Sequence, residues 1–83
     1  MKITVKYFAS IREAIGQGSE TLDTPAATLA NLRDELIARG PVYADSLARG
    51  KAVRMALNQV MADESAALTD GAEVAFFPPV TGG

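Results

Sequence analysis

Polar and apolar residues alternate along residues 2–8, near the start of the chain. Alternation of this kind has the two-residue period of a strand with one buried face. Phe8 is the exception, because it is a large apolar residue on the side that carries Lys2, Thr4 and Lys6. The side predicted to be buried carries Ile3, Val5 and Tyr7.

The next segment combines helical spacing with glycines. Residues 9–16 (ASIREAIG) carry apolar residues three and four positions apart and close on Gly16. This pattern predicts a helical turn or a loop beneath the sheet. Gly16 and Gly18 then lead into a second predicted strand over residues 19–24, which a loose hairpin connection joins to the first strand.

The clearest helical pattern covers Thr28 to Arg39. Thr28 is a residue type that caps helix starts, and the following Gly40-Pro41 pair favours a helix end. Glu35 and Arg39 are four positions apart, which predicts an ion pair along the helix. The apolar positions form one stripe, so one face of the helix is expected to lie on a sheet. This stripe consists of Leu29, Leu32, Leu36 and Ile37.

The second half of the chain predicts two further strands. Residues 42–50 show no clear pattern and suggest a second short helix at most. A turn is predicted in RGKAV (49–53), which lacks the first glycine and the Ser or Thr of a phosphate-binding loop. Alternation returns in AVRMALN (52–58), and again in LTDGAEVAFF (68–77) with a turn at Asp70-Gly71. The inward positions of these strands are Val53, Met55, Leu57, Val74 and Phe76, whereas Phe77 points outward.

Strand, strand, helix, strand, strand with one main amphipathic helix predicts an α+β fold. We interpret it as a ubiquitin-like β-grasp, a mixed sheet with the helix packed on one face. The first and last strands of such a sheet usually lie side by side at its centre. Phe8 and Phe77 are therefore expected to meet on the uncovered face as an aromatic docking patch. The alternative is that residues 42–50 cover both side chains.

Residues 78–83 (PPVTGG) are predicted to form a protruding C-terminal tail beyond a domain of residues 1–77. Pro78 and Pro79 lack a backbone N–H, so they end strand pairing and keep the chain extended. Six extended residues span roughly 20 Å, which carries a terminal carboxylate into a cleft of another protein. The closing Gly-Gly pair lacks Cβ atoms, so a narrow channel admits it. A frayed, inert end is the alternative.

The amino-acid composition excludes several kinds of catalytic and metal-binding site. The chain has 83 residues, with no Cys and no His, so it lacks thiolate and imidazole groups for catalysis and for most transition-metal sites. Its ten carboxylates are scattered over positions expected to be solvated. A net charge of −2 argues against nucleic acid and suggests a basic protein partner. No apolar run is long enough for a membrane span or a signal peptide, so a cytoplasmic location is expected.

Three stretches resemble one known family: YFASIREAIG, ALNQ and LTDGAEVAFFPPVTGG. Over nearly its whole length, the chain resembles the small sulfur-carrier subunits of molybdopterin synthase, within the ubiquitin-like sulfur-carrier superfamily. The match departs from the family pattern at Ala72, where an acidic residue is often seen.

The resemblance implies that the chain end is the reactive group. An ATP-dependent, ubiquitin-activating-like adenylyltransferase would adenylate the Gly83 carboxylate, and a sulfur donor would convert it to a thiocarboxylate. The sulfur would then pass to a cyclic pyranopterin precursor in molybdenum cofactor biosynthesis. On this view the chain is no enzyme on its own and binds no cofactor or metal. ATP belongs to the activating enzyme, and the catalytic groups belong to the large subunit of a heterotetramer of two small and two large chains.

The resemblance also assigns residues to partner contacts. Phe8, Met61 and Phe77 would form the apolar surface that docks the activating enzyme and the large subunit. The pattern of alternation does not place Met61 on either face of the sheet. The segment expected to insert into the partner comprises Pro78, Pro79, Val80, Thr81 and Gly82, ahead of Gly83.

Three alternative functions stay open at the level of sequence. A thiamine-pathway sulfur carrier also ends in Gly-Gly, but it is usually shorter and lacks the Phe-Pro-Pro element. A ubiquitin-like protein modifier would form isopeptide bonds with lysines. A plain β-grasp interaction domain would have an inert tail.

Overall fold

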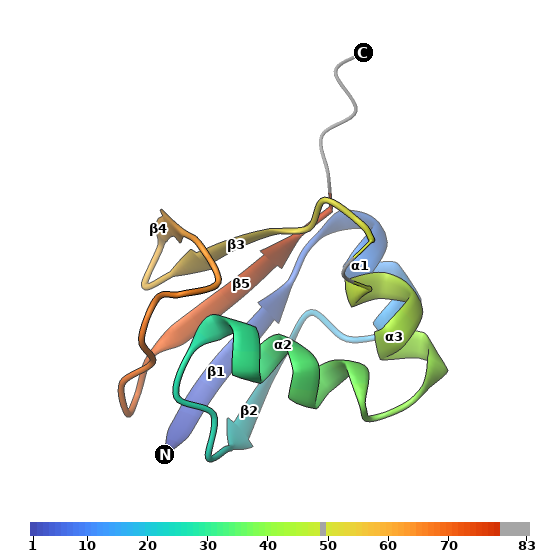
Figure 1. Ribbon diagram of the computed structural model, residues 1–83. Coiled ribbons are helices and arrows are strands. Elements are labelled where there is room, and N and C mark those ends of the chain that lie inside the picture. The colour runs from blue at the N-terminus through green and yellow to red at the C-terminus, as the bar shows by residue number, and fades with distance from the viewer. Residues whose placement is uncertain (49, 79–83) are drawn as a thin grey trace.

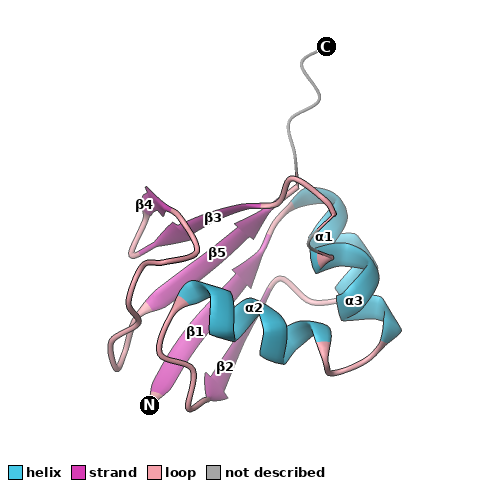
Figure 2. Cartoon of the chain, in the orientation of Figure 1, coloured by secondary structure: helices cyan, strands magenta, loops and turns pink. Residues whose placement is uncertain are grey.

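A computed structural model of the chain describes residues 1–48 and 50–78, which form a five-stranded sheet and three helices (Figures 1 and 2). Helix α2 lies across one face of the sheet, and α1 and α3 pack beside it near one end of the sheet (Figure 1). The elements are β1 (Lys2–Tyr7), α1 (Ala9–Ile15), β2 (Ser19–Asp23), α2 (Leu29–Ile37), α3 (Pro41–Leu47), β3 (Arg54–Leu57), β4 (Val60–Ala62) and β5 (Glu73–Phe77).

The sheet is mixed, as predicted. Its strand order is β2-β1-β5-β3-β4, so the last strand in sequence lies at the centre, beside the first. Strands β1 and β5 run parallel, with Val5 opposite Val74, whereas the remaining pairs are antiparallel. Because β5 is central, the chain leaves the sheet from its middle and not from an edge (Figure 1).

The core forms where the stripe of α2 meets the inward side of the central strands. Thr28 caps the helix as predicted, accepting a hydrogen bond from the Asn31 N–H at 3.2 Å. Each fully buried leucine of the stripe stabilises the fold by about 1.5 to 3 kcal/mol relative to an exposed one. The side chains with at most 1% of their surface exposed include Ile3, Val5, Tyr7, Leu29, Leu32, Leu36, Val74 and Phe76.

The predicted ion pair between Glu35 and Arg39 is wrong. Helix α2 ends at Ile37, so Arg39 lies beyond the helical turn that would bring it over Glu35. Its guanidinium instead donates to Oε1 of Glu20 at 2.7 Å, on strand β2. The Glu35 carboxylate accepts a hydrogen bond from the buried Thr24 hydroxyl at 2.6 Å.

The structure contains two elements, α3 and β4, that the sequence pattern left uncertain or did not predict. The second short helix exists as α3 and begins at Pro41, where proline removes no helical hydrogen bond. Strand β4 was not predicted, because three residues are too few to show a period. It follows a two-residue turn in which Asn58 and Gln59 both have positive φ, 50° and 69°, the conformation of a type I′ hairpin.

Candidate docking site at the tail root

The aromatic patch, formed by Phe8 and Phe77, lies where β1 and β5 end. The two rings stack with centroids 4.7 Å apart and planes 11° from parallel. The Phe8 N–H donates to the Phe76 carbonyl at 3.2 Å, and the Phe8 carbonyl accepts from the Ile11 N–H at the start of α1. Phe8 is thus fixed by backbone bonds on both sides, and the predicted meeting of the two phenylalanines is confirmed.

The parallel register places a second aromatic pair directly beneath the patch. Tyr7 lies opposite Phe76, and their rings stack with centroids 6.2 Å apart in the core. Because successive side chains of a strand point to opposite faces, burying this pair forces Phe8 and Phe77 outward. Phe8 keeps 39% of its surface exposed, so the alternative that residues 42–50 cover it is wrong.

Met61 lies on the same uncovered face as Phe77. It pairs with Ala56 of β3, which pairs with Ala75 of β5, two positions before Phe77. Met61 has 57% of its surface exposed. The missing prediction of β4 is the reason that sequence alternation could not place this residue, and the Asn58 turn was the only local signal for it.

The tail root, Phe77 and Pro78, is the point where the chain leaves the sheet. Pro78 lines a groove of about 540 Å³ between α1 and α3. The groove is bordered by Ser10, Ile11, Ala14, Asp45, Ser46 and Lys51. The remaining residues predicted to insert into a partner, Pro79, Val80, Thr81, Gly82 and Gly83, lie outside the described residues.

Glu20, one of the carboxylates expected to be solvated, lies at the centre of a cluster of polar side chains. Burial alone raises the pKa of Glu20, but hydrogen bonds from Arg39 and Tyr7 outweigh it, so the pKa lies below its ordinary value. Tyr43 and Gln17 donate to the same carboxylate at 3.1 and 3.0 Å. Glu20 is therefore an ionised structural anchor and not a candidate general base.

The Tyr7 hydroxyl is tied to this same cluster. It donates to Oε2 of Glu20 at 2.8 Å. Burial, and then the adjacent Glu20 carboxylate, raise the pKa of Tyr7 well above its ordinary value. Tyr7 stays protonated at any physiological pH, so it acts as a hydrogen-bond donor that fixes the strand beneath the aromatic patch.

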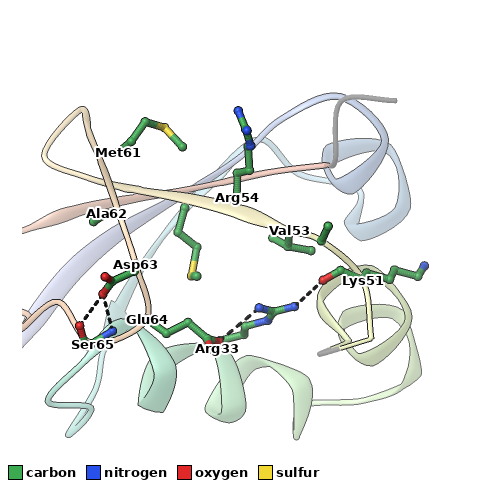
Figure 3. Close-up of a pocket in the computed structure, with 11 residues that line it drawn as sticks. Arg33, Lys51, Val53, Arg54, Met61, Ala62, Asp63, Glu64 and Ser65 are labelled. Atoms are coloured by element: carbon green, nitrogen blue, oxygen red, sulfur yellow. Dashed lines mark hydrogen bonds and ion pairs between the residues drawn. The ribbon is translucent and has the colours of Figure 1, made fainter. Parts of the chain in front are cut away.

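A second cleft, of about 700 Å³, separates β3 and β4 from α2 (Figure 3). Its floor holds Arg33, whose guanidinium is only 6% exposed and pairs with Glu64 at 3.2 Å. Arg33 also donates to the carbonyls of Leu47, Ala48 and Lys51. These bonds satisfy the guanidinium and fix the loop before β3.

The part of the chain that the structure describes offers neither a metal site nor a membrane-spanning helix. Within residues 1–48 and 50–78, no three Asp or Glu side chains are gathered closely enough to hold a metal ion. None of the helices in these described ranges is long and apolar enough to cross a membrane. The tail root with its aromatic patch is therefore the candidate site that we carry forward.

The fold and the tail root define a ubiquitin-like β-grasp domain whose C-terminal strand ends in a stacked aromatic pair, with Phe8 exposed and Phe77 half-buried. The chain belongs to the ThiS family, whose family model matches residues 5–83. The resemblance found in the sequence is confirmed by two curated relatives, both called molybdopterin synthase sulfur carrier subunit. The Escherichia coli protein is 41% identical and the Haemophilus influenzae protein 40% identical, each over 81 residues that cover 98% of this chain and 99% of the relative.

A solved structure supports the same fold. The complex of subunits 1 and 2 of molybdopterin-converting factor from Helicobacter pylori contains a chain similar to this one, with a TM-score of 0.70 and 26% identity. The similarity covers 100% of both chains. In that protein, the similar chain is found in complex with another subunit.

Proposed function

We propose that the chain is the sulfur carrier subunit of a molybdopterin synthase, with the Gly83 carboxylate as the group that carries sulfur. The observation that carries this proposal is the similarity to two curated relatives called molybdopterin synthase sulfur carrier subunit, which are 40% and 41% identical over 98% of this chain. The family match over residues 5–83 supports it, because it includes the C-terminal Gly-Gly pair.

Loading proceeds in two steps, the first at the α-phosphorus of ATP and the second at the carbonyl carbon of Gly83. An ATP-dependent adenylyltransferase joins the Gly83 carboxylate to AMP and releases pyrophosphate. A sulfur donor then forms a C–S bond at this carbon as the C–O bond to AMP breaks, which leaves a thiocarboxylate and free AMP. The absence of side chains on Gly82 and Gly83 leaves the carbonyl open to attack.

Transfer takes place on a large subunit. The thiocarboxylate sulfur attacks the pyranopterin precursor, and water replaces the lost sulfur to regenerate the carboxylate. A dithiolene contains two sulfur atoms, so each product consumes two loaded chains. This chain contributes no His or Cys, and Glu20 is held in structural hydrogen bonds. The catalytic acid and base groups are therefore assigned to the large subunit, and ATP to the activating enzyme.

The docking role belongs to the aromatic patch together with Met61. A stacked pair at the tail root, with Phe8 exposed and Phe77 half-buried, offers an apolar anchor of the kind that dominates protein interfaces. A partner that binds there holds the start of the tail, so Pro78 to Gly83 enter its active site in an extended path. We further propose a cytoplasmic heterotetramer of two small and two large chains, as the family resemblance implies.

Intact mass measurement tests the loading step. The chain is purified from cells in which molybdenum cofactor synthesis is active, and again from cells that lack the activating enzyme. We expect a gain of about 16 Da, one oxygen replaced by sulfur, only in the first preparation. An unchanged mass in both would favour an inert interaction domain.

Reconstitution tests the acceptor. The thiocarboxylated chain is mixed with a molybdopterin synthase large subunit and the pyranopterin precursor, and the dithiolene formed per loaded chain is measured. We expect one product for two chains. Sulfur delivery to a thiazole-forming enzyme, or attachment of the chain to protein lysines, without dithiolene product would reject the proposal in favour of those alternatives.

A further inference from the structure

The segment before β3 carries an unusual charge pattern that the proposed function does not use. Residues 49–54 (RGKAVR) contain three cations and no anion, in a chain whose net charge is −2. The predicted turn is confirmed there, since the Lys51 N–H donates to the Ala48 carbonyl and the Val53 N–H to the Lys51 carbonyl. This turn directly precedes β3, so the backbone of Lys51 is held close to the start of that strand.

Lys51 and Arg54 are exposed and, among the described residues, neither has a carboxylate within ion-pair distance. Three other cations do have such partners, since Lys6 pairs with Glu73, Arg33 with Glu64 and Arg39 with Glu20, whereas Lys2 and Arg12 also form no ion pair among the described residues. Asp45 borders the same groove as Lys51 but forms no ion pair with it. Lys51 and Arg54 are therefore left available to groups outside the fold.

Both residues lie at the tail root. Arg54 is directly opposite Phe77 in the β3–β5 ladder, so it lies on the same face as the aromatic patch. Figure 3 shows that its side chain and that of Met61 project to the same side of the sheet. Lys51 borders the groove between α1 and α3 together with Pro78. The two charges thus stand at the point where the chain leaves the sheet, one beside the patch and one beside the groove.

From this placement we propose that Lys51 and Arg54 form a cationic collar that pairs with Asp or Glu side chains around the mouth of the partner's tail channel. The inference rests on the proposed function, because only a protein that admits the tail must surround the tail root. The collar adjoins the aromatic patch, so one protein surface covers both. Phosphate backbones fit less well, because they also meet the patch and the net negative charge.

The collar acts mainly on the approach of the two proteins. Unpaired exposed charges contribute little to the stability of the isolated chain. Within a Debye length of about 8 Å at physiological ionic strength, however, they attract an acidic rim and orient the tail toward it. The rest of the molecule is net negative and is repelled by the same rim. The pairing therefore selects the one orientation in which the tail faces the channel.

The test measures association rates of the full chain with the large subunit and with the activating enzyme, in low and high salt. The variants K51E and R54E each change the net charge by two, and K2E is the matched control. Lys2 lies at the start of β1, at the end of the sheet opposite the tail root. We expect K51E and R54E to slow association roughly tenfold at low salt with at least one partner, and K2E to slow it less than about twofold.

Three results decide the matter. A rate loss that disappears at high salt, with unchanged melting temperatures, supports the collar. Equal association rates for K51E, R54E and K2E with both partners, or faster association of K51E, would overturn the collar. If the wild-type chain still transfers sulfur in the same samples, the proposed function stands without the collar. If the wild-type chain neither binds nor delivers sulfur to these partners, the proposed function fails and the collar fails with it.

Discussion

Adjacent residues of β5 have opposite roles because the strand alternates between the core and the uncovered face. Phe76 is fully buried and stacks on Tyr7, whereas Phe77 stacks on Phe8 outside the core. The same alternation continues from Tyr7, the buried last residue of β1, to Phe8, the exposed and still extended residue that follows it. Because of this register, Tyr7 and Phe76 contribute to the stability of the fold, whereas their neighbours Phe8 and Phe77 are left for contact with a partner.

Substituting the two phenylalanines separates these roles. Phe76→Ala removes a fully buried ring and is expected to lower the free energy of unfolding by about 3 to 5 kcal/mol. Phe77→Ala is expected to cost the isolated chain much less, but to weaken binding to the large subunit by about 2 kcal/mol. Calorimetry of unfolding and of binding measures both effects. Equal destabilisation by the two substitutions would contradict the face assignment.

Glu20 predicts a pH dependence of stability. Its pKa is lowered in the folded chain below the ordinary value of 4.5, so its stabilising contribution is present above that value and is lost as pH falls through the folded pKa. Glu20→Gln should lower the free energy of unfolding at neutral pH by about 1 to 2 kcal/mol. The difference from wild type should shrink as the pH is lowered below 4.5, as measured by urea denaturation.

Glu13→Gln is the matched control for this prediction. Glu13 is an exposed residue of α1 and has no hydrogen bond among the described residues. Its substitution is expected to leave the free energy of unfolding nearly unchanged at both pH values. A pH-independent loss in Glu20→Gln would show that the amide fails for a steric reason and not because charge is lost.

For the helices and strands, the sequence predicted the features that show a regular spacing of apolar residues. It missed the contacts between residues that are far apart in the chain. Apolar alternation placed Phe76 and Phe77 correctly, and helical spacing placed α2. The three-residue strand β4 gave no period, so Met61 had no predicted face. Arg39 was paired within its own helix, because the sequence does not show that Glu20 of β2 lies closer. Pairings across the sheet depend on tertiary packing, which local pattern does not encode.

The β3–β4 turn offers a direct test of element geometry. Gln59 has a φ of 69°, which a residue with a Cβ adopts at a cost. Gln59→Gly is expected to raise the free energy of unfolding by about 0.5 kcal/mol, after the greater freedom of glycine in the unfolded chain is subtracted. Gln59→Ala keeps the Cβ and should give no such gain. Urea denaturation measures both, and an equal effect of the two substitutions would count against a strained turn.

For the whole molecule, the described fold and the proposed chemistry occupy separate parts of the chain. The buried core extends from Ile3 to Phe76, and the proposed reactive atom belongs to Gly83. The sequence indicated this division through Pro78-Pro79 and Gly82-Gly83. It could not indicate the collar, because Lys51 and Arg54 meet the tail root only after β3 has paired with β5.

Because the described core and the proposed reactive group lie in different parts of the chain, we expect that changes at the chain end leave the fold intact. Deleting Gly83, or adding a residue after it, is expected to abolish adenylate formation by the activating enzyme, because the acyl group is lost or displaced. The melting temperature should stay unchanged, because chain ends generally contribute little to stability and, among the described residues, the buried core ends at Phe76. Pyrophosphate release and thermal unfolding measure the two effects. Full activation of an extended chain that has not been trimmed would contradict the prediction.

The central place of β5 also bears on how the protein is made. Strands β1 and β2 form one pair and β3 and β4 another, and only β5 joins the two pairs into a sheet. During synthesis the ribosome delivers β5 last of the five, so the sheet cannot close until residues 73–77 have emerged. A nascent chain that stalls before this point has neither a complete core nor a stacked Phe8 and Phe77. Unfinished chains are therefore expected to be degraded before they can compete for the partner.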